Sequence, residues 1–314
     1  MSTIKNYLSL VKFSHTIFAM PFALIGFFLG VVQIINLSQL SFSTEMPDSP
    51  WATFFKEAGT NVAIYFVKLL GLVILCMVFA RSAAMAFNRY LDRSFDAKNP
   101  RTAIREIPKG IISANSALLF TIFCCVAFVV CCYLINTTVL YLAPIALFVI
   151  LFYSYTKRFT PLCHIVLGLG LALAPIGAYL AVIARFDLLP ILFAFAVLFW
   201  VSGFDIIYAL QDEEFDRQNN LHSIPAALGK AKALRVSEIL HLLSSACVMA
   251  AGFYGHFGWL YWVGVLVFGG MLIYQHSIVK PNDLRRVNLA FMTANGIASV
   301  VFAVFVIADL IVKS

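Results

Sequence analysis

Long apolar runs separated by short polar segments make up most of this chain. The apolar residues are continuous rather than alternating, which favours membrane-spanning helices over the strands of a membrane barrel. Each run is close to the 20 or so residues that a helix needs to cross the hydrocarbon core. The pattern predicts nine spans, near residues 15–35, 62–86, 113–134, 138–156, 164–184, 188–210, 234–254, 258–279 and 288–311.

The composition agrees with this pattern. Of the 314 residues, 62% are hydrophobic and only 12% are charged, whereas a soluble domain carries roughly 25% charged residues. The apolar runs leave no room for a soluble domain, so we expect an all-α integral membrane protein with nine transmembrane helices in one ring-like bundle around a central cavity. The seven cysteines all lie in apolar segments and lack the spacing of a zinc site, so we interpret them as packing residues.

Basic residues concentrate in alternate connections between the predicted spans. With the N-terminus taken as cytoplasmic, 18 of the 22 Lys and Arg residues fall on the cytoplasmic side. Because cytoplasmic loops are enriched in Lys and Arg, we expect a multi-pass protein of the cytoplasmic (inner) membrane with its N-terminus inside and its C-terminus outside. We expect membrane lipid around the chain and no nucleic acid partner.

Three oxygen-bearing side chains, Asn88, Asp92 and Asp96, are spaced four residues apart. On a helix they lie on one face, where two carboxylates repel each other unless a cation lies between them. Carboxylate and amide oxygens are the ligands that hard divalent cations prefer. This spacing at a membrane edge therefore predicts one half of a metal site.

The chain repeats this pattern 120 positions later. Asp92–Asp96 and Asp212–Asp216 both read Asp-x-x-Phe-Asp, and each is followed by an Asn three residues on, Asn99 and Asn219. We therefore expect a single domain, residues 1–314, with two pseudo-repeat halves whose motifs at 88–96 and 212–216 share one site on the cytoplasmic face. Asp205 lies seven residues before Asp212, two turns deeper on the same face, and Tyr208 takes the position of Asn88 in the second copy.

Basic residues surround both acidic motifs, notably Arg101 and Arg105 after the first motif and Lys157 and Arg158 after the fourth span. Such residues are also typical of a cytoplasmic loop. Acidic side chains interleaved with basic ones, however, favour a metal-bridged polyanion such as a diphosphate as the ligand. A diphosphate above an apolar cavity suggests an isoprenyl diphosphate with its tail in lipid, whose departure Mg²⁺ and the bases would assist.

The segment from Asn88-x-x-x-Asp92-x-x-x-Asp96 through Arg101 to Arg105 resembles the first signature of the membrane-embedded aromatic prenyltransferases, the 4-hydroxybenzoate polyprenyltransferase family of the UbiA superfamily. Asp212-x-x-x-Asp216 resembles the second signature, and Tyr153-x-x-x-Lys157 resembles the YxxxK element. The resemblance implies that Asn88, Asp92, Asp96, Asp212 and Asp216 hold two Mg²⁺ ions, with the four aspartates catalytic, and that Arg101, Arg105 and Lys157 bind the diphosphate. Further candidate substrate contacts are Lys12, Tyr153, Arg158, Asp205 and Tyr208.

Two departures from the family pattern bear on the acceptor. Many members have Asp after the first Asn, where this chain has Arg89, and the first span resembles a bacterial branch of which some members prenylate a naphthoate. We expect Mg²⁺-dependent transfer of a polyprenyl group from a polyprenyl diphosphate to an aromatic acid of the 4-hydroxybenzoate type in ubiquinone biosynthesis. The first alternative within the family is a naphthoate acceptor in menaquinone biosynthesis. Haem farnesylation and chlorophyll or archaeal lipid synthesis are further alternatives within the family.

Two readings from other classes stay open at this point. A cation-coupled transporter would also use paired acids, but usually near the middle of the bilayer rather than at one edge. A phosphatase or lipid-phosphate transferase would also use Mg²⁺ and a phosphate, but would need an activated water or a second headgroup site.

Overall fold

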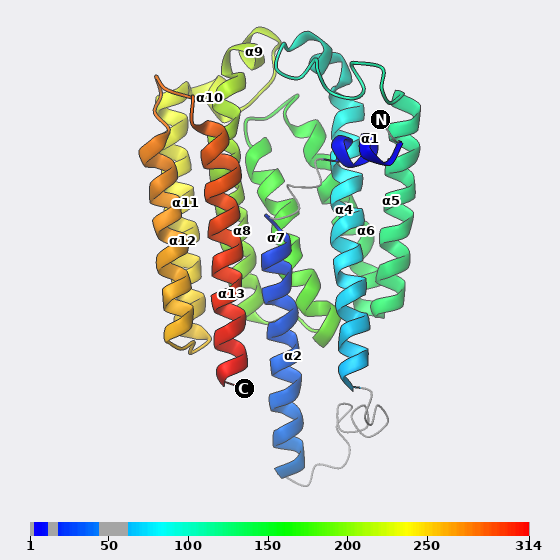
Figure 1. Ribbon diagram of the computed structural model, residues 1–314, viewed down its shortest axis with the longest axis vertical. Helices are drawn as coiled ribbons and strands as arrows, with labels where there is room; N and C mark the ends of the chain where they lie inside the picture. Colours follow the sequence, from blue (N-terminus) through cyan, green and yellow to red (C-terminus); the bar gives the residue numbers. More distant parts are fainter. Residues whose placement is uncertain (1–2, 12–17, 44–61, 314) are drawn as a thin grey trace.

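The computed structural model shows a bundle of long helices that share one axis (Figure 1). It describes residues 3–11, 18–43 and 62–313, and no strand occurs in these ranges. The helices that run along the bundle are α2 (Met20–Ser43), α4 (Val62–Lys98), α5 (Ala114–Ile135), α6 (Thr137–Thr156), α7 (Cys163–Ile183), α8 (Leu188–Ala209), α11 (Lys230–Tyr254), α12 (Trp259–Ile278) and α13 (Asn295–Lys313).

This arrangement confirms the all-helical membrane fold. Over the described part of the chain, eight helices are long and apolar enough to span a membrane, and the apolar stretch Met20–Asn36 of α2 adds a ninth. The main difference from the expected spans lies at their ends. Helix α4 continues to Lys98, so the first acidic motif is part of the spanning helix itself.

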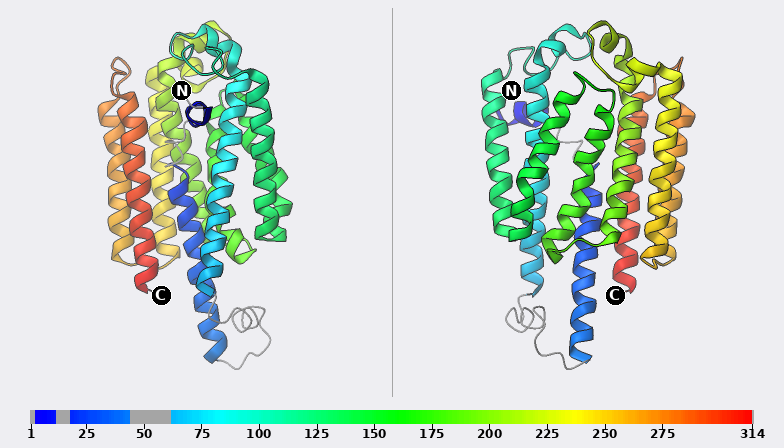
Figure 2. Two further views of the ribbon diagram at one scale, coloured as in Figure 1. Left: turned by 45° about the vertical axis from the view of Figure 1, so that its right-hand side comes forward. Right: turned by 180° about the vertical axis from the view of Figure 1, so that it is seen from behind.

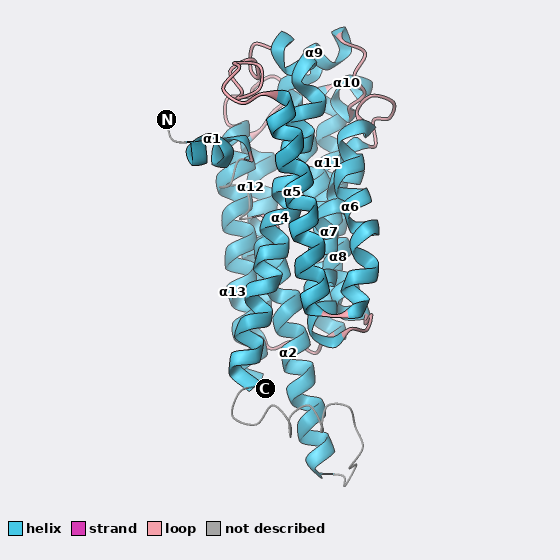
Figure 3. Cartoon of the chain, turned by 90° about the vertical axis from the view of Figure 1, so that its right-hand side faces the viewer, coloured by secondary structure: helices cyan, strands magenta, loops and turns pink. Residues whose placement is uncertain are grey.

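Neighbouring helices pack in an order that closes the bundle. Helices α4, α5, α6 and α7 contact one another in sequence, as do α8, α11, α12 and α13. Helix α7 packs on α8, while α2 contacts α4, α7, α8 and α13 and so joins the two groups. Figure 2 shows the upper part of α2 between α4 and α13, and in Figure 3 its lower end extends beyond the neighbouring helices.

Short elements gather at one end of the bundle. The helices α1 (Thr3–Leu10), α9 (Glu213–Gln218) and α10 (Ile224–Leu228) lie there together with the connections around them, whereas α13 ends at the opposite end (Figures 1 and 2). Leu10 of α1 is fully buried against Ala86 of α4 and Ala117 of α5. Both acidic motifs are at the end that carries α1.

A buried polar network fixes the start of α13. The side-chain amide of Asn295 donates to the carbonyl oxygens of Ala290 and Phe291, and its Oδ1 accepts from Trp200 Nε1 at 2.9 Å and from Gln275 Nε2 at 2.7 Å. Residues Leu289–Ala294 form a π-helical turn, a geometry found frequently at functional sites. The turn places the Phe291 ring 4.3 Å, centroid to centroid, from that of Tyr208.

Close approach of α2 to α7 depends on a missing side chain. A Cβ atom at Gly26 would lie 2.1 Å from the carbonyl oxygen of Pro175, inside any permitted contact. Because this neighbour is a backbone atom, the clash could be relieved only if the two helices moved apart. Gly71 of α4, in contrast, has no atom within 4 Å of the same position.

We therefore expect Gly26→Ala to lower the thermal unfolding temperature in detergent, at a cost of about 1–3 kcal/mol for an overpacked contact. Gly71→Ala is the matched control and should unfold at or slightly above the wild-type temperature, because Ala is the better helix former by up to about 1 kcal/mol. Equal unfolding temperatures for the two variants would contradict the close packing of α2 on α7.

Candidate active site

A polar cavity of about 530 Å³ opens between the helices at the end that carries α1. Residues from α4, α6, α7, α8 and α9 line it, together with the segment after α4. Among the residues that the sequence singled out, those lining this cavity are Asn88, Asp92, Asp96, Arg101, Arg105, Tyr153, Lys157, Asp205, Tyr208, Asp212 and Asp216. Arg158 reaches the cavity through Asp92, and Lys12 lies outside the described residues.

The first motif lies on the last turns of α4, with its three side chains facing the cavity as the spacing predicts. Asp92 accepts a hydrogen bond from Asn88 Nδ2 at 3.0 Å and forms an ion pair with Arg158 Nη2, also at 3.0 Å. Asp96 is buried, and its Oδ1 lies 2.6 Å from Arg105 Nη1. Each carboxylate of this motif therefore has a basic partner of its own.

The second motif is not on a continuous helix. Helix α8 ends at Ala209, a 3₁₀ turn covers Leu210–Asp212, and α9 begins at Glu213. Asp212 accepts from Arg101 through both carboxylate oxygens, with Nε 2.9 Å from Oδ1, and also from Asn99 Nδ2 at 3.1 Å. The segment that follows the first motif thus holds the first carboxylate of the second motif.

Arg101 also donates from Nη1 to the hydroxyl of Tyr208 at 2.9 Å, and its guanidinium lies over that ring. Burial lowers the pKa of Arg101, but the hydrogen bond to Asp212 and the charge of Asp212 together raise it by more. The net pKa is therefore above the ordinary value. Tyr208 therefore occupies the site in a different way from Asn88, whose place it takes in the sequence repeat. Its partner is a base rather than a carboxylate.

Asp216 has no solvent exposure and is held from two sides. Its Oδ1 lies 2.7 Å from Lys157 Nζ, and its Oδ2 accepts from Ser223 Oγ at 2.8 Å. Burial lowers the pKa of Lys157, but the charge of Asp216 and the hydrogen bond to it outweigh this effect, and the net pKa lies above the ordinary value. Lys157 is therefore a stable cation inside the cavity.

Four carboxylates and four bases thus form four separate pairs: Asp92 with Arg158, Asp96 with Arg105, Asp212 with Arg101 and Asp216 with Lys157. A buried charge without a partner costs several kcal/mol. The formal charge of the eight groups is zero, which makes the cluster stable without any ligand. The same groups provide oxygen ligands for cations and donors for an anion, in one cavity.

The carboxylates suit a hard cation. Asp96 Oδ2 is buried and has no hydrogen-bond partner within the described ranges, and a buried carboxylate oxygen without a partner is what a hard cation binds. No group of three or more His, Cys, Asp or Glu side chains in the described part of the chain is placed to hold a metal ion unaided. Mg²⁺ usually takes only one or two carboxylates and completes its shell with phosphate oxygens and water, so the residues fit this ion.

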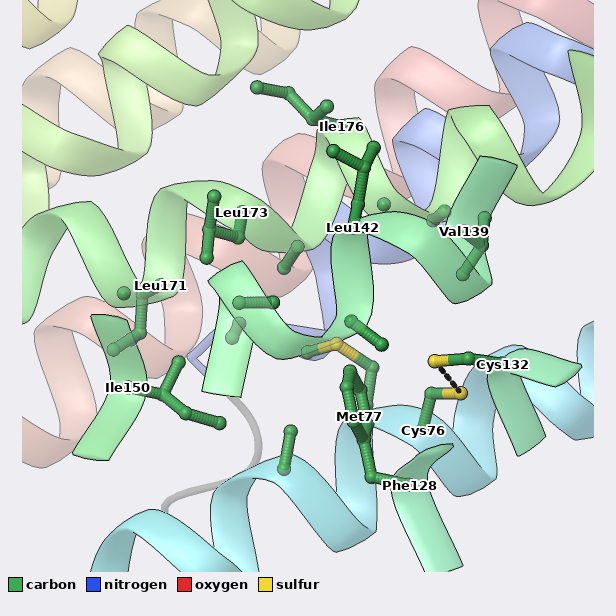
Figure 4. A pocket seen from close by; sticks show the side chains of 18 of the residues that line it. Cys76, Met77, Phe128, Cys132, Val139, Leu142, Ile150, Leu171, Leu173 and Ile176 are labelled. Carbon is green, nitrogen blue, oxygen red and sulfur yellow. Dashed lines mark hydrogen bonds between the residues drawn. The ribbon is translucent and has the colours of Figure 1, made fainter. Parts of the chain in front are cut away.

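The charged cavity continues into an apolar one. A second cavity of about 300 Å³ lies between α4, α5, α6 and α7, and Figure 4 shows side chains that line it, including Met77, Phe128, Leu142 and Leu171. Both cavities share the side chains of Arg81, Met85, Tyr153, Leu167 and Leu171. A ligand with a charged head and an apolar tail therefore finds both surfaces adjacent.

Sequence reasoning missed several residues of this site. Asn99 stood out as a shared residue of the two motifs, but nothing indicated its bond to Asp212, and Asn219 makes only a local bond to the carbonyl of Phe215. Arg89 lines the cavity with only 4% exposure, although it entered the sequence argument only as a departure from the family pattern. His164 carries no motif at all, and it contacts Asp205.

The helical membrane fold and the acid–base cavity at its end define an integral membrane protein with a site suited to a metal-bound phosphate. A model of the UbiA prenyltransferase family matches residues 50–297, and the chain belongs to this family. The chain is 27% identical over 259 residues to 4-hydroxybenzoate octaprenyltransferase of Tolumonas auensis, covering 82% of this chain and 88% of the relative. It is 29% identical over 253 residues to the enzyme of the same name in Salmonella newport, covering 80% and 87%. The chain is thus a prenyltransferase.

Solved structures agree with this assignment. A UbiA homolog from Aeropyrum pernix K1 is 26% identical with a TM-score of 0.72, covering 95% of this chain and 98% of the homolog. A UbiA homolog from Archaeoglobus fulgidus, bound to DMAPP and Mg²⁺, has the same fold, with a TM-score of 0.67 at 18% identity and coverages of 98% and 99%.

The pairing of the second motif yields a matched test. Asp212→Asn and Asp216→Asn should each lower kcat/KM for prenyl transfer by about 10²-fold or more, the scale of a lost charge-stabilising group. Glu214 lies between them in the sequence but is exposed, and its one side-chain hydrogen bond to a described residue comes from Gln218, so Glu214→Gln should keep wild-type activity. The measurement is product formation by purified, monodisperse protein. Wild-type activity in Asp212→Asn would contradict the role of the second motif.

Proposed function

We propose that this prenyltransferase moves a polyprenyl group from a polyprenyl diphosphate to the ring of an aromatic acid of the 4-hydroxybenzoate type, with Mg²⁺, in quinone biosynthesis. The observation that carries the proposal is the set of four acid–base pairs beside a continuous apolar cavity. Carboxylates recognise metal ions, bases recognise phosphate oxygens, and the apolar cavity suits an isoprenoid chain.

In this proposal, binding is an exchange of partners. Asn88, Asp92, Asp96, Asp212 and Asp216 would hold the Mg²⁺ ions, and the bases now paired with the aspartates would turn to the diphosphate. Arg101 and Arg105 provide planar forks that match phosphate oxygens, and Lys157 provides a point charge. Lys12, which lies outside the described residues, is proposed as a further anion contact. The activity named for the Tolumonas auensis relative, and the DMAPP and Mg²⁺ bound to the Archaeoglobus fulgidus homolog, support this proposal.

The reaction then divides between the head and the tail of the donor. Mg²⁺ supplies charge neutralisation as the allylic C–O bond breaks. Arg101, Arg105 and Lys157 stabilise the departing diphosphate, while the apolar walls exclude water from the carbon left behind. Aromatic rings at the cavity, those of Phe204, Tyr208 and Phe291, offer π-faces to a cationic carbon.

Two acceptors fit the proposal, 4-hydroxybenzoate and, as the alternative, a naphthoate of menaquinone biosynthesis. Purified protein should be incubated with Mg²⁺, a radiolabelled polyprenyl diphosphate and each acid in turn. We expect label to enter one aromatic product, no product in excess EDTA, and recovery when Mg²⁺ is restored. Full turnover in EDTA would contradict the metal-bridged site. Cation-dependent uptake into vesicles without prenyl transfer would instead indicate the transporter reading.

We also propose that the end of the bundle with the acidic motifs faces the cytoplasm and that the C-terminus faces outward, as the distribution of Lys and Arg favours. In a variant without native cysteines, Gln218→Cys on α9 and Arg185→Cys between α7 and α8 place single exposed thiols at opposite ends. We expect a membrane-impermeant maleimide applied from outside intact cells to label position 185 and not position 218. The reverse pattern would invert the orientation.

A further inference from the structure

One carboxylate of the cavity differs from the four motif aspartates. Asp205 of α8 lines the cavity with 25% of its side chain exposed, yet it forms no ion pair with any Lys or Arg that the structure describes. Its Oδ2 lies 2.6 Å from His164 Nδ1, at the start of α7. This aspartate is therefore held by a titratable imidazole rather than by a Lys or Arg.

The position of His164 defines its tautomer. Its Nε2 accepts a hydrogen bond from the backbone N–H of Ile224 at 3.3 Å, so in the neutral ring the proton is on Nδ1 and is donated to Asp205. The ring is almost fully buried, and its backbone carbonyl accepts from Ser202 Oγ at 3.1 Å. His164 therefore fixes one oxygen of Asp205, and the other, Oδ1, makes no hydrogen bond to any described residue.

The depth of Asp205 places it away from the diphosphate. Asp205 lies four residues before the end of α8 at Ala209, about 6 Å along the helix axis, and the 3₁₀ turn that contains Asp212 follows beyond that end. A donor whose diphosphate lies at the motifs has its reacting carbon deeper, toward the apolar cavity, and the aromatic ring must meet that carbon there. Phe204, Tyr208, Leu167 and Leu171 line the cavity around this depth.

Ring prenylation needs a base at this level. When the allylic C–O bond breaks, its electron pair leaves with the diphosphate, and the ring forms a C–C bond to the freed carbon. The ring regains its aromaticity only when a proton leaves the substituted carbon and the C–H electron pair returns to the ring. The motif aspartates are poorly suited to take this proton, because each is already neutralised by a base or, in the proposed function, by a metal ion.

We infer that Asp205 is the base that accepts the ring proton through Oδ1, and that His164 is a positioning residue that holds Asp205 in place. The inference rests on the proposed function. The proton passes to water when the product leaves, so the carboxylate is restored in each cycle. Removal of a proton by a positioned general base typically accelerates a reaction by about 10²–10⁴-fold.

The experiment uses full-length protein, Mg²⁺, a labelled polyprenyl diphosphate and whichever aromatic acid the wild type prenylates, in protiated form and deuterated at the substituted position. For Asp205→Asn we expect kcat to fall by about 10²-fold or more with little change in the KM of the donor. The deuterium isotope effect on kcat should rise above that of the wild type, because loss of the ring proton becomes rate-limiting. Asp205→Glu should recover part of the rate.

Two further variants separate the roles. His164→Gln should lower kcat less than Asp205→Asn and should also raise the isotope effect, as expected for a group that only orients the base. Asp309→Asn is the matched control, because Asp309 is a buried aspartate that accepts from Gly258 N at 2.7 Å far from the site. It should leave both kcat and the isotope effect unchanged.

Several outcomes would overturn the inference. An unchanged kcat and an unchanged isotope effect in Asp205→Asn would exclude Asp205 as the base. A raised KM of the donor without a raised isotope effect would also exclude it, and would indicate that Asp205 binds the donor. A low kcat without an isotope effect in both Asp205→Asn and Asp205→Glu, in protein that elutes and unfolds like the wild type, would also exclude it. A wild-type enzyme that prenylates no aromatic acid would refute the proposed function itself, whereas the other outcomes leave that function intact.

Discussion

Charge balance inside a low-dielectric bundle is the constraint on which this structure depends. Isolated charges at this depth cost several kcal/mol, so each carboxylate of the motifs needs a partner before any ligand arrives. Arg101, Arg105, Lys157 and Arg158 meet that need one by one. These pairs also cross between helices, with Asp212 tied to the segment after α4 and Asp216 tied to the end of α6. The pairing that balances these charges therefore also holds the helices around the cavity.

The chemistry of the site follows from the same balance. In the proposed function, the neutral cluster would exchange its internal partners for a metal-bound diphosphate. The polar network around Asn295 supports the site from behind, since it fixes the turn that places Phe291 against Tyr208. Aromatic packing and ion pairs thus lie side by side at the cavity.

Much of this was accessible from sequence. The continuous apolar runs defined nine spans because only helices satisfy their own backbone in lipid, and the four-residue spacing of Asn88, Asp92 and Asp96 placed all three on one face. The repeat and the basic residues near it pointed to the residues that line the cavity. These features are local or compositional, so they can be recognised from the sequence alone.

The partners of each carboxylate were not accessible, because they depend on how helices far apart in the sequence pack. Asn99 and Asp212 are 113 residues apart, and His164 and Asp205 are 41 apart. The change from α-helix to a 3₁₀ turn after Ala209, which interrupts α8 at the second motif, carries no Pro or Gly signal. The role of His164 could not be predicted from the sequence either, because a lone histidine in an apolar run is usually a packing residue.

Lys157 and Arg158 are consecutive residues at the end of α6, yet they hold different motifs, Asp216 and Asp92. One step of backbone joins them, so the end of α6 connects the two acidic motifs directly. A change that displaces the end of α6 therefore reaches both halves of the cavity at once.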